Sequence, residues 1–129
     1  MNIMNKIGTS IEQSQKLIEL GLDVNTADMM WDDWSLIDEG WKLNVGYYPE
    51  IEQDYGRKCY PAWSLAALFD VLPKYIGDYG KCLYYDIGGY YCGYMDDGDF
   101  MLTIEETMAD NPVDACYEMI LRLHEQELL

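Results

Sequence analysis

Two clusters of carboxylates have the residue types and spacing that a catalytic or metal site would need. Asp96, Asp97 and Asp99 surround one glycine, and Asp32 and Asp33 lie between tryptophans. Paired carboxylates can bind Mg²⁺ or share the work of hydrolysing a glycosidic bond. However, the EF-hand spacing is absent, Asp-Gly is itself a turn signal, and a chain with 24 acidic residues brings carboxylates together by chance. We therefore predict no catalytic residues and no metal site, with a carboxylate- or Mg-dependent hydrolase or lyase as the alternative.

Nucleophilic catalysis has little support in the sequence. A serine or cysteine nucleophile normally needs a base, and His124, near the end of a predicted helix, is the single histidine. The chain contains no Gly-x-Ser-x-Gly, no phosphate-binding glycine loop and no His-Glu-x-x-His. We predict no cofactor, and an enzyme is the less favoured class.

Aromatic side chains offer chemistry of a different kind. The chain has 12 Tyr and 4 Trp but only 2 Phe, a bias typical of binding surfaces. Three tryptophans fall between residues 31 and 41, and aromatic faces can hold nucleotide bases by stacking. Together with the nearby tyrosines and cations they predict a ligand site made of Trp31, Trp34, Trp41, Tyr47, Tyr48, Lys42, Arg57 and Lys58.

The charge balance narrows the choice of partner. The 129 residues carry 24 Asp and Glu against 8 Lys and Arg, which gives a net charge of −16 and a pI near 4.1. Such a surface repels phosphate backbones and anionic lipids, so we predict no binding to free nucleic acid or to membranes. The acidity either serves solubility alone or forms a face for a basic partner, including imitation of DNA.

The cysteines indicate a reducing compartment. Cys59, Cys82, Cys92 and Cys116 form no C-x-x-C pair, and Cys82 and Cys92 fall on opposite faces of one predicted hairpin. We predict four free thiols in a cytoplasmic protein, which is the host cytoplasm if the chain is phage-encoded. The N-terminal residues lack an apolar export segment, and no run is long enough to span a bilayer.

The clearest structural signal is a three-stranded antiparallel meander over 81–104. Gly88-Gly89 and Asp97-Gly98 supply the positive φ angles that two-residue hairpin turns need. This register predicts that Tyr85 faces Cys92 and leaves two apolar faces. No helix is evident to cover one of them, so we predict an oligomer interface on that face at Tyr85, Tyr90 and Tyr94.

The other elements follow from capping and periodicity. Helices are predicted from Thr9 or Ser10 to Gly21, over 65–72 after Ser64, and from Pro112 onward after Asn111. Strands are predicted over 29–36 and 41–48 with the turn at 38–40, and connections over 49–58, 74–80 and 105–110. The chain is therefore a single α+β domain over 1–129, with an antiparallel sheet of two or more hairpins and about three helices packed on one face.

Three blocks of the sequence carry a resemblance. The blocks are 16–22 followed by 25–29, then 61–65 through 72–73, and then 111–119. Together they resemble small acidic proteins carried by phages and mobile elements of gut Bacteroides and their relatives. The resemblance covers most of the chain and implies a genomic setting, without a reaction or catalytic residues. Small accessory phage proteins often counter host defence.

Composition and resemblance together favour a non-catalytic binding protein. It would counter host defence by sequestering a small nucleotide-type signal or by blocking a defence protein, and we expect it to be a homo-oligomer. A structural phage accessory protein is the other open alternative.

Overall fold

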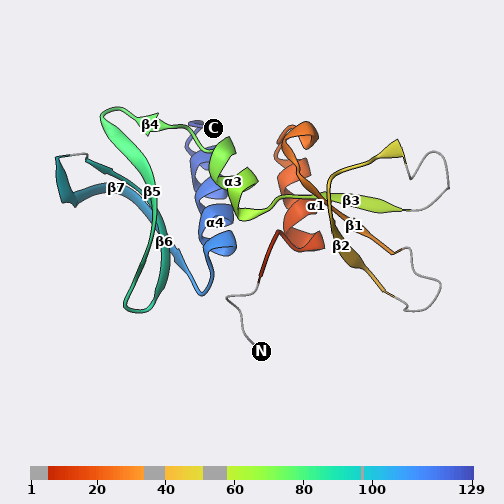
Figure 1. Cartoon of the computed structure of the whole chain (residues 1–129). Helices are drawn as coiled ribbons and strands as arrows, with labels where there is room; N and C mark the ends of the chain where they lie inside the picture. The colour runs from red at the N-terminus through yellow and green to blue at the C-terminus, as the bar shows by residue number, and fades with distance from the viewer. Residues whose placement is uncertain (1–5, 34–39, 51–57, 97) are drawn as a thin grey trace. The chain divides into compact units, whose positions relative to one another are not determined.

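The computed structural model describes residues 6–33, 40–50, 58–96 and 98–129 of the chain. It shows an α+β fold with two antiparallel sheets, which confirms the predicted class (Figure 1). The hairpins are distributed over two sheets, each in its own compact unit. Gly8–Ala67 forms the N-terminal unit, and Leu68–Leu129 with Lys6 and Ile7 forms the C-terminal unit.

The N-terminal unit begins with helix α1 (Ile11–Glu19), which starts where the sequence predicts. Ser10 accepts a hydrogen bond from the Gln13 amide, and the Gln13 side chain accepts one from the Ser10 amide, which completes a capping box. The chain leaves the helix through Gly21, whose φ of 92° suits glycine. A short 3-10 turn, η2 (Val24–Thr26), leads into the sheet.

The first sheet has the order β2-β1-β3. The predicted hairpin is confirmed by β1 (Met29–Asp32) and β2 (Lys42–Val45), although β2 is shorter than predicted and residues 34–36 of the other predicted strand lie outside the described residues. Asp38 and Glu39 of the predicted turn lie outside the described residues. The third strand, β3 (Cys59–Ala62), was missed. A proline is disfavoured inside a sheet, but Pro61 is tolerated because β3 lies at the sheet edge.

A buried polar network joins the start of this unit to its end. The Thr9 hydroxyl accepts a hydrogen bond from the Trp63 amide over 3.1 Å and is bonded to the Ser14 hydroxyl over 2.8 Å. The Thr9 amide in turn donates to the Trp63 carbonyl over 2.9 Å. All three side chains are fully buried. This network, with Leu17 of α1, forms the core of the N-terminal unit.

Helix α3 (Leu65–Val71) contains the boundary between the two units. The Ser64 hydroxyl accepts from the Ala67 amide, which confirms Ser64 as the N-cap. Within the C-terminal unit, the helix end is bound by Lys81, whose ammonium donates to the carbonyl oxygens of Phe69 and Leu72.

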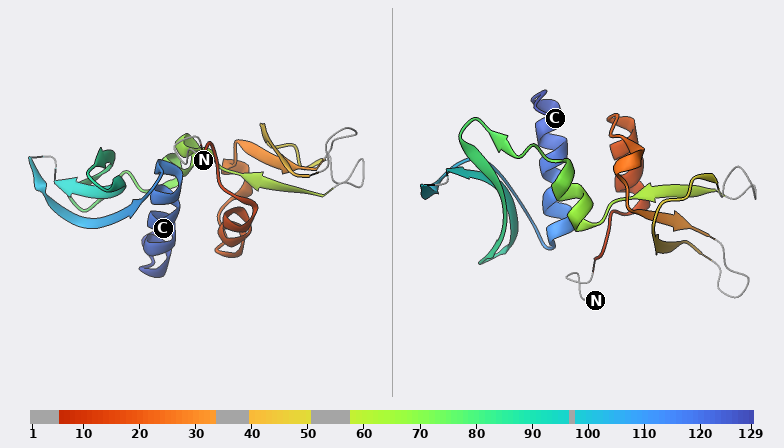
Figure 2. Two further views of the ribbon diagram at one scale, coloured as in Figure 1. Left: turned by 90° about the horizontal axis from the view of Figure 1, so that it is seen from below. Right: turned by 45° about the horizontal axis from the view of Figure 1, so that its top comes forward.

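The predicted meander is confirmed in the C-terminal unit, as strands β5 (Tyr79–Asp86), β6 (Gly89–Asp96) and β7 (Asp99–Ala109). A short strand that the sequence did not predict, β4 (Tyr75–Ile76), extends the sheet to the order β4-β5-β6-β7. Figure 2 shows β5 to β7 as long curved strands.

The first meander turn lies one residue earlier than predicted. Asp86 pairs with Gly89, so Ile87 and Gly88 are the loop residues and Leu83, not Tyr85, faces Cys92. Gly89 belongs to the strand because it approaches β7 closely: a Cβ there would lie 2.5 Å from the Ala109 carbonyl oxygen. The register of the β5–β6 pair changes by two residues, so the side chains of β5 and β6 keep their predicted faces.

Strand β7 is much longer than predicted and replaces the expected connection over 105–110. Irregular pairing near Tyr94 and Met95 shifts the register, after which pairing continues to Tyr90 and Ala109. The segment forms a strand because alternate side chains find opposite environments: Thr107 is buried, whereas Glu106 and Met108 are exposed.

Helix α4 (Pro112–Glu125) covers one face of this sheet. Asn111 caps it by accepting from the Asp114 amide over 2.8 Å, as the sequence predicts. Figures 1 and 2 show α4 running along one side of the curved strands. The predicted apolar stripe is buried there: Val113, Cys116, Tyr117, Ile120 and Leu123.

Candidate functional site

An aromatic patch lies on one face of the N-terminal sheet. Trp31 of β1 pairs with Leu43 and with Tyr60, so their side chains share a face. The ring of Trp41, just before β2, lies 5.3 Å from the Tyr60 ring at an interplanar angle of 51°. The Lys58 ammonium lies 5.9 Å from the centre of the Tyr60 ring. We call Trp41, Tyr60 and Lys58 the aromatic patch.

The members of this face differ in what they can offer a ligand. The Trp31 indole donates a hydrogen bond to the Thr9 carbonyl over 2.8 Å and is half-buried, so it supports the sheet. Trp41 is 38% exposed, and Tyr60 beside it is half-buried. A planar ligand can therefore reach the Trp41 and Tyr60 rings while a charged group on it meets Lys58.

The structure brings together some of the predicted ligand residues and separates others. Trp31, Trp41 and Lys58 share one face of the sheet. Lys42 pairs with Asp32, so its side chain points to the opposite face. Tyr47 is half-buried, and Tyr48 is exposed with its ring close to Gly46. Trp34 and Arg57 lie outside the described residues. Tyr60 was missed, because its place beside Trp41 depends on a strand that the sequence did not indicate.

The predicted tyrosine interface is divided by the fold. Tyr94 is fully buried, and its hydroxyl donates to the Pro73 carbonyl over 2.6 Å, so it belongs to the core of the C-terminal unit. Tyr85 is 69% exposed and its ring lies 5.0 Å from that of Tyr90. The expectation that no helix covers this face was wrong for its inner part, because the Cys92 thiol is hydrogen-bonded to Cys116 of α4 and both Cys92 and Tyr94 are fully buried, whereas Tyr85 near the hairpin tip is exposed.

The carboxylate clusters do not assemble a catalytic pair in the described residues. Asp32 is buried and Asp33 is exposed, so their environments differ. The Asp96 carboxylate accepts from the Gly98 amide over 2.7 Å, which is ordinary turn chemistry. Asp97 lies outside the described residues. Within the described ranges, no three His, Cys, Asp or Glu side chains are grouped so that they could hold a metal ion.

The cysteines are free thiols in the structure, as predicted. Cys92 in β6 and Cys116 in α4 are fully buried. A hydrogen bond with Cys116, and then burial, raise the pKa of the Cys92 thiol far above its ordinary value. Burial also raises the pKa of the Cys82 thiol. Protonated thiols are poor nucleophiles, so neither residue is suited to covalent catalysis.

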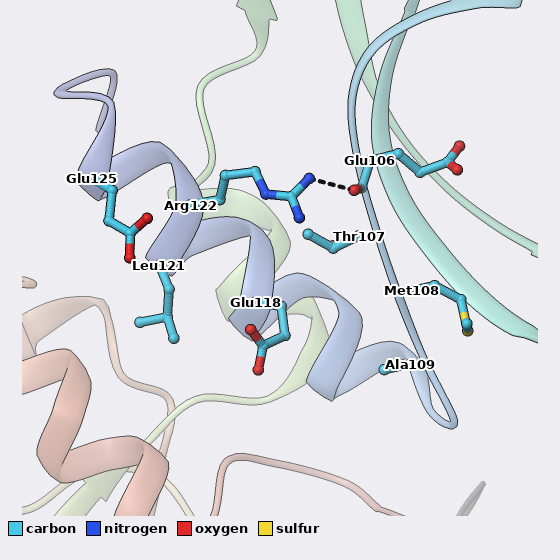
Figure 3. A pocket seen from close by; sticks show the side chains of 8 residues that line it. All are labelled: Glu106, Thr107, Met108, Ala109, Glu118, Leu121, Arg122 and Glu125. Atoms are coloured by element: carbon cyan, nitrogen blue, oxygen red, sulfur yellow. Dashed lines mark hydrogen bonds between the residues drawn. The ribbon is translucent and has the colours of Figure 1, made fainter.

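A groove of about 500 Å³ runs between β7 and α4 (Figure 3). Its walls are four consecutive residues of β7 and one side of α4: Glu106, Thr107, Met108, Ala109, Glu118, Leu121, Arg122 and Glu125. Arg122 extends from α4 to β7, where its guanidinium donates to the Glu106 backbone carbonyl over 2.5 Å. The sequence did not indicate this groove, because the 105–110 segment was expected to be a connection.

No helix in the described part of the chain combines the length and apolarity needed to cross a membrane. Family models, curated proteins and solved structures were each compared with the chain, and none of the three comparisons found a match.

Proposed function

We propose that this chain is a non-catalytic binding protein that holds a small nucleotide-type ligand on the aromatic patch. The observation that carries the proposal is the placement of two aromatic rings 5.3 Å apart beside a lysine on one sheet face. A base stacks on the exposed Trp41 ring, and Lys58 meets a phosphate. Stacking on aromatic side chains contributes about 1–3 kcal/mol per base.

The net charge of −16 restricts the ligand to a small molecule. A polyanion such as RNA would meet many carboxylates, whereas a mononucleotide or cyclic dinucleotide needs one local cation. The resemblance to phage and mobile-element proteins supports a role in the host cytoplasm, where sequestering a nucleotide signal would counter host defence.

The test is a titration of the protein with AMP, with a cyclic dinucleotide and with adenosine. Tryptophan fluorescence and calorimetry measure the binding. Trp41→Ala should weaken binding of all three by about fivefold to a hundredfold, the equivalent of one lost stacking contact. Lys58→Gln should weaken binding of AMP but leave adenosine unchanged, because only the phosphate needs the cation. Lys16→Gln, at an exposed position of α1, is the matched control.

Equal loss of AMP binding in the Lys58→Gln and Lys16→Gln variants would contradict the site, because it would show only a general effect of charge. Ligand recovered intact after heating supports sequestration, and hydrolysed ligand would favour the enzyme alternative.

We also propose that copies of the chain associate through the exposed tip of the β5–β6 hairpin. Tyr85, whose ring lies beside that of Tyr90, is 69% exposed, and Ile87 in the turn is 92% exposed. Association should strengthen with salt, because screening reduces repulsion between two chains of charge −16. Light scattering should show that Tyr85→Asp reduces the assembled fraction, whereas Tyr75→Asp, at an exposed site on β4, leaves it unchanged.

A further inference from the structure

Strand β7 leaves one side of its backbone unpaired by any strand of the sheet. It is the outer strand in the order β4-β5-β6-β7 and is 11 residues long. A Cβ placed on Gly93 of β6 would lie 3.0 Å from the Glu105 carbonyl oxygen, and a Cβ on Gly89 would lie 2.5 Å from the Ala109 carbonyl oxygen. The carbonyl groups of Glu105 and Ala109 therefore point toward β6. Backbone groups alternate along an antiparallel strand. Glu106 and Met108 therefore direct their N–H and C=O groups away from β6.

These outward groups open into the groove beside α4. Glu106 and Met108 form one wall, and Glu118, Leu121 and Glu125 of α4 form the other (Figure 3). An edge strand beside a cleft can bind an extended peptide as an additional strand, in which main-chain hydrogen bonds give affinity and side-chain contacts give specificity.

Arg122 already forms a hydrogen bond with one of these outward backbone carbonyls. Its guanidinium donates to the Glu106 carbonyl over 2.5 Å and approaches the Glu105 carboxylate at 3.5 Å. The arginine side chain is 44% exposed, so it is attached to the edge without being enclosed. It supplies the donor that the amide of an added strand would supply.

We infer that the edge of β7 and the facing side of α4 are a docking groove for an extended, basic segment of a partner protein, which adds to the sheet as a fifth strand. The charge of the groove selects this occupant. Two carboxylates of α4, Glu118 and Glu125, line it beside Arg122, in a chain of net charge −16, whereas the Glu106 carboxylate points away from α4 and accepts from the Tyr84 hydroxyl (Figure 3). An acidic segment, including a second copy of this chain, is repelled, whereas Lys and Arg side chains meet Glu118 and Glu125. This groove lies wholly in the C-terminal unit, so the inference is independent of the nucleotide site.

The first test separates strand addition from general attraction of positive charge. The probe is a fluorescein-labelled 11-residue peptide of alternating lysine and threonine, the length of β7, and binding is followed by fluorescence anisotropy. Met108→Pro removes an N–H that faces the groove and not β6, at a residue that is 53% exposed. It should weaken binding about tenfold relative to Met108→Ala, the equivalent of one or two strand hydrogen bonds.

The second test uses substitutions that do not touch the sheet. Glu118→Gln with Glu125→Gln, both exposed on α4, should weaken peptide binding several-fold more than Glu12→Gln with Glu19→Gln, which remove the same charge from exposed positions of α1. Arg122→Gln should strengthen binding, because it frees the Glu106 acceptor and removes a positive charge.

Three results would overturn the inference. One is no binding of the peptide by the unaltered protein, and another is equal binding by Met108→Pro and Met108→Ala. The third is an equal effect of the two glutamate pairs, which would mean that the peptide responds to net charge alone. If Met108→Pro lowers the unfolding midpoint so far that the protein does not fold, the glutamate pairs decide the question.

Discussion

The Thr107 hydroxyl in β7 donates a hydrogen bond over 2.6 Å to the Ala115 carbonyl oxygen in α4. Both residues are buried, and the bond joins the strand to the helix that together enclose the groove. A buried hydrogen bond contributes about 0.5–1.5 kcal/mol to stability, and its loss leaves a polar group without that partner.

Thr107→Val should therefore lower the free energy of unfolding by about 1 kcal/mol, since the shape is retained and the donor is lost. Urea denaturation followed by circular dichroism measures the change. Thr103→Val is the matched control, because Thr103 is exposed on the same strand and surface substitutions usually change stability by less than about 0.5 kcal/mol. Equal effects at the two positions would show that the bond is not stabilising.

The Thr9 hydroxyl should be the most sensitive polar group of the N-terminal unit. Thr9→Val removes the acceptor of the buried Trp63 amide and the partner of Ser14, so it should destabilise the unit by about 1–3 kcal/mol. Thr9→Ser keeps the hydroxyl. Hydrogen exchange at the Trp63 amide should therefore accelerate in Thr9→Val and stay slow in Thr9→Ser, and fast exchange in both would contradict the network.

The thiols should react in a fixed order. All four should be counted in denaturant, because the described cysteines are free. In the folded protein Cys82 is the partly exposed one and should react first with a maleimide, slowly because of its raised pKa. Cys82→Ser should remove that early phase, and the three remaining thiols should react only after denaturant unfolds the protein. An early phase that persists in this variant would contradict the burial of the other three.

Stability should fall at alkaline pH. The folded pKa of Cys92 is raised above its ordinary value of 9.0, and burial raises that of Tyr94 above 10.0. The unfolded chain therefore releases these protons at lower pH than the folded chain does. The contribution of these two groups to the free energy of unfolding is fully present below about pH 9 and is lost as the pH rises beyond it.

Urea denaturation at a series of pH values checks this sign. Cys92→Ala should be less stable at neutral pH because a buried side chain is truncated, but its stability should fall less between pH 8 and about pH 10.5. An equally steep fall in the variant and the unaltered protein would show that the Cys92 thiol does not contribute.

The sequence by itself determined the helix boundaries and the meander, because both depend on residues close together in the chain. The Ser10 and Gln13 capping box, the Asn111 cap and the buried stripe of α4 are all as the local pattern predicts. The faces of the β5 and β6 side chains were also predicted correctly, because a register change of two residues leaves each side chain on its own face.

Only the tertiary structure decided where strands pair and what they bring together. Strand β3 has four residues and a proline, so no periodicity reveals it, and it forms because β1 offers an unpaired edge. The position of Tyr60 beside Trp41 follows from that pairing. The register at Gly89 likewise depends on the carbonyl of Ala109, twenty residues later, and the extension of β7 to that residue creates the groove with α4. Strand pairing joins residues distant in sequence, and its energy comes from backbone bonds and burial that no local pattern records.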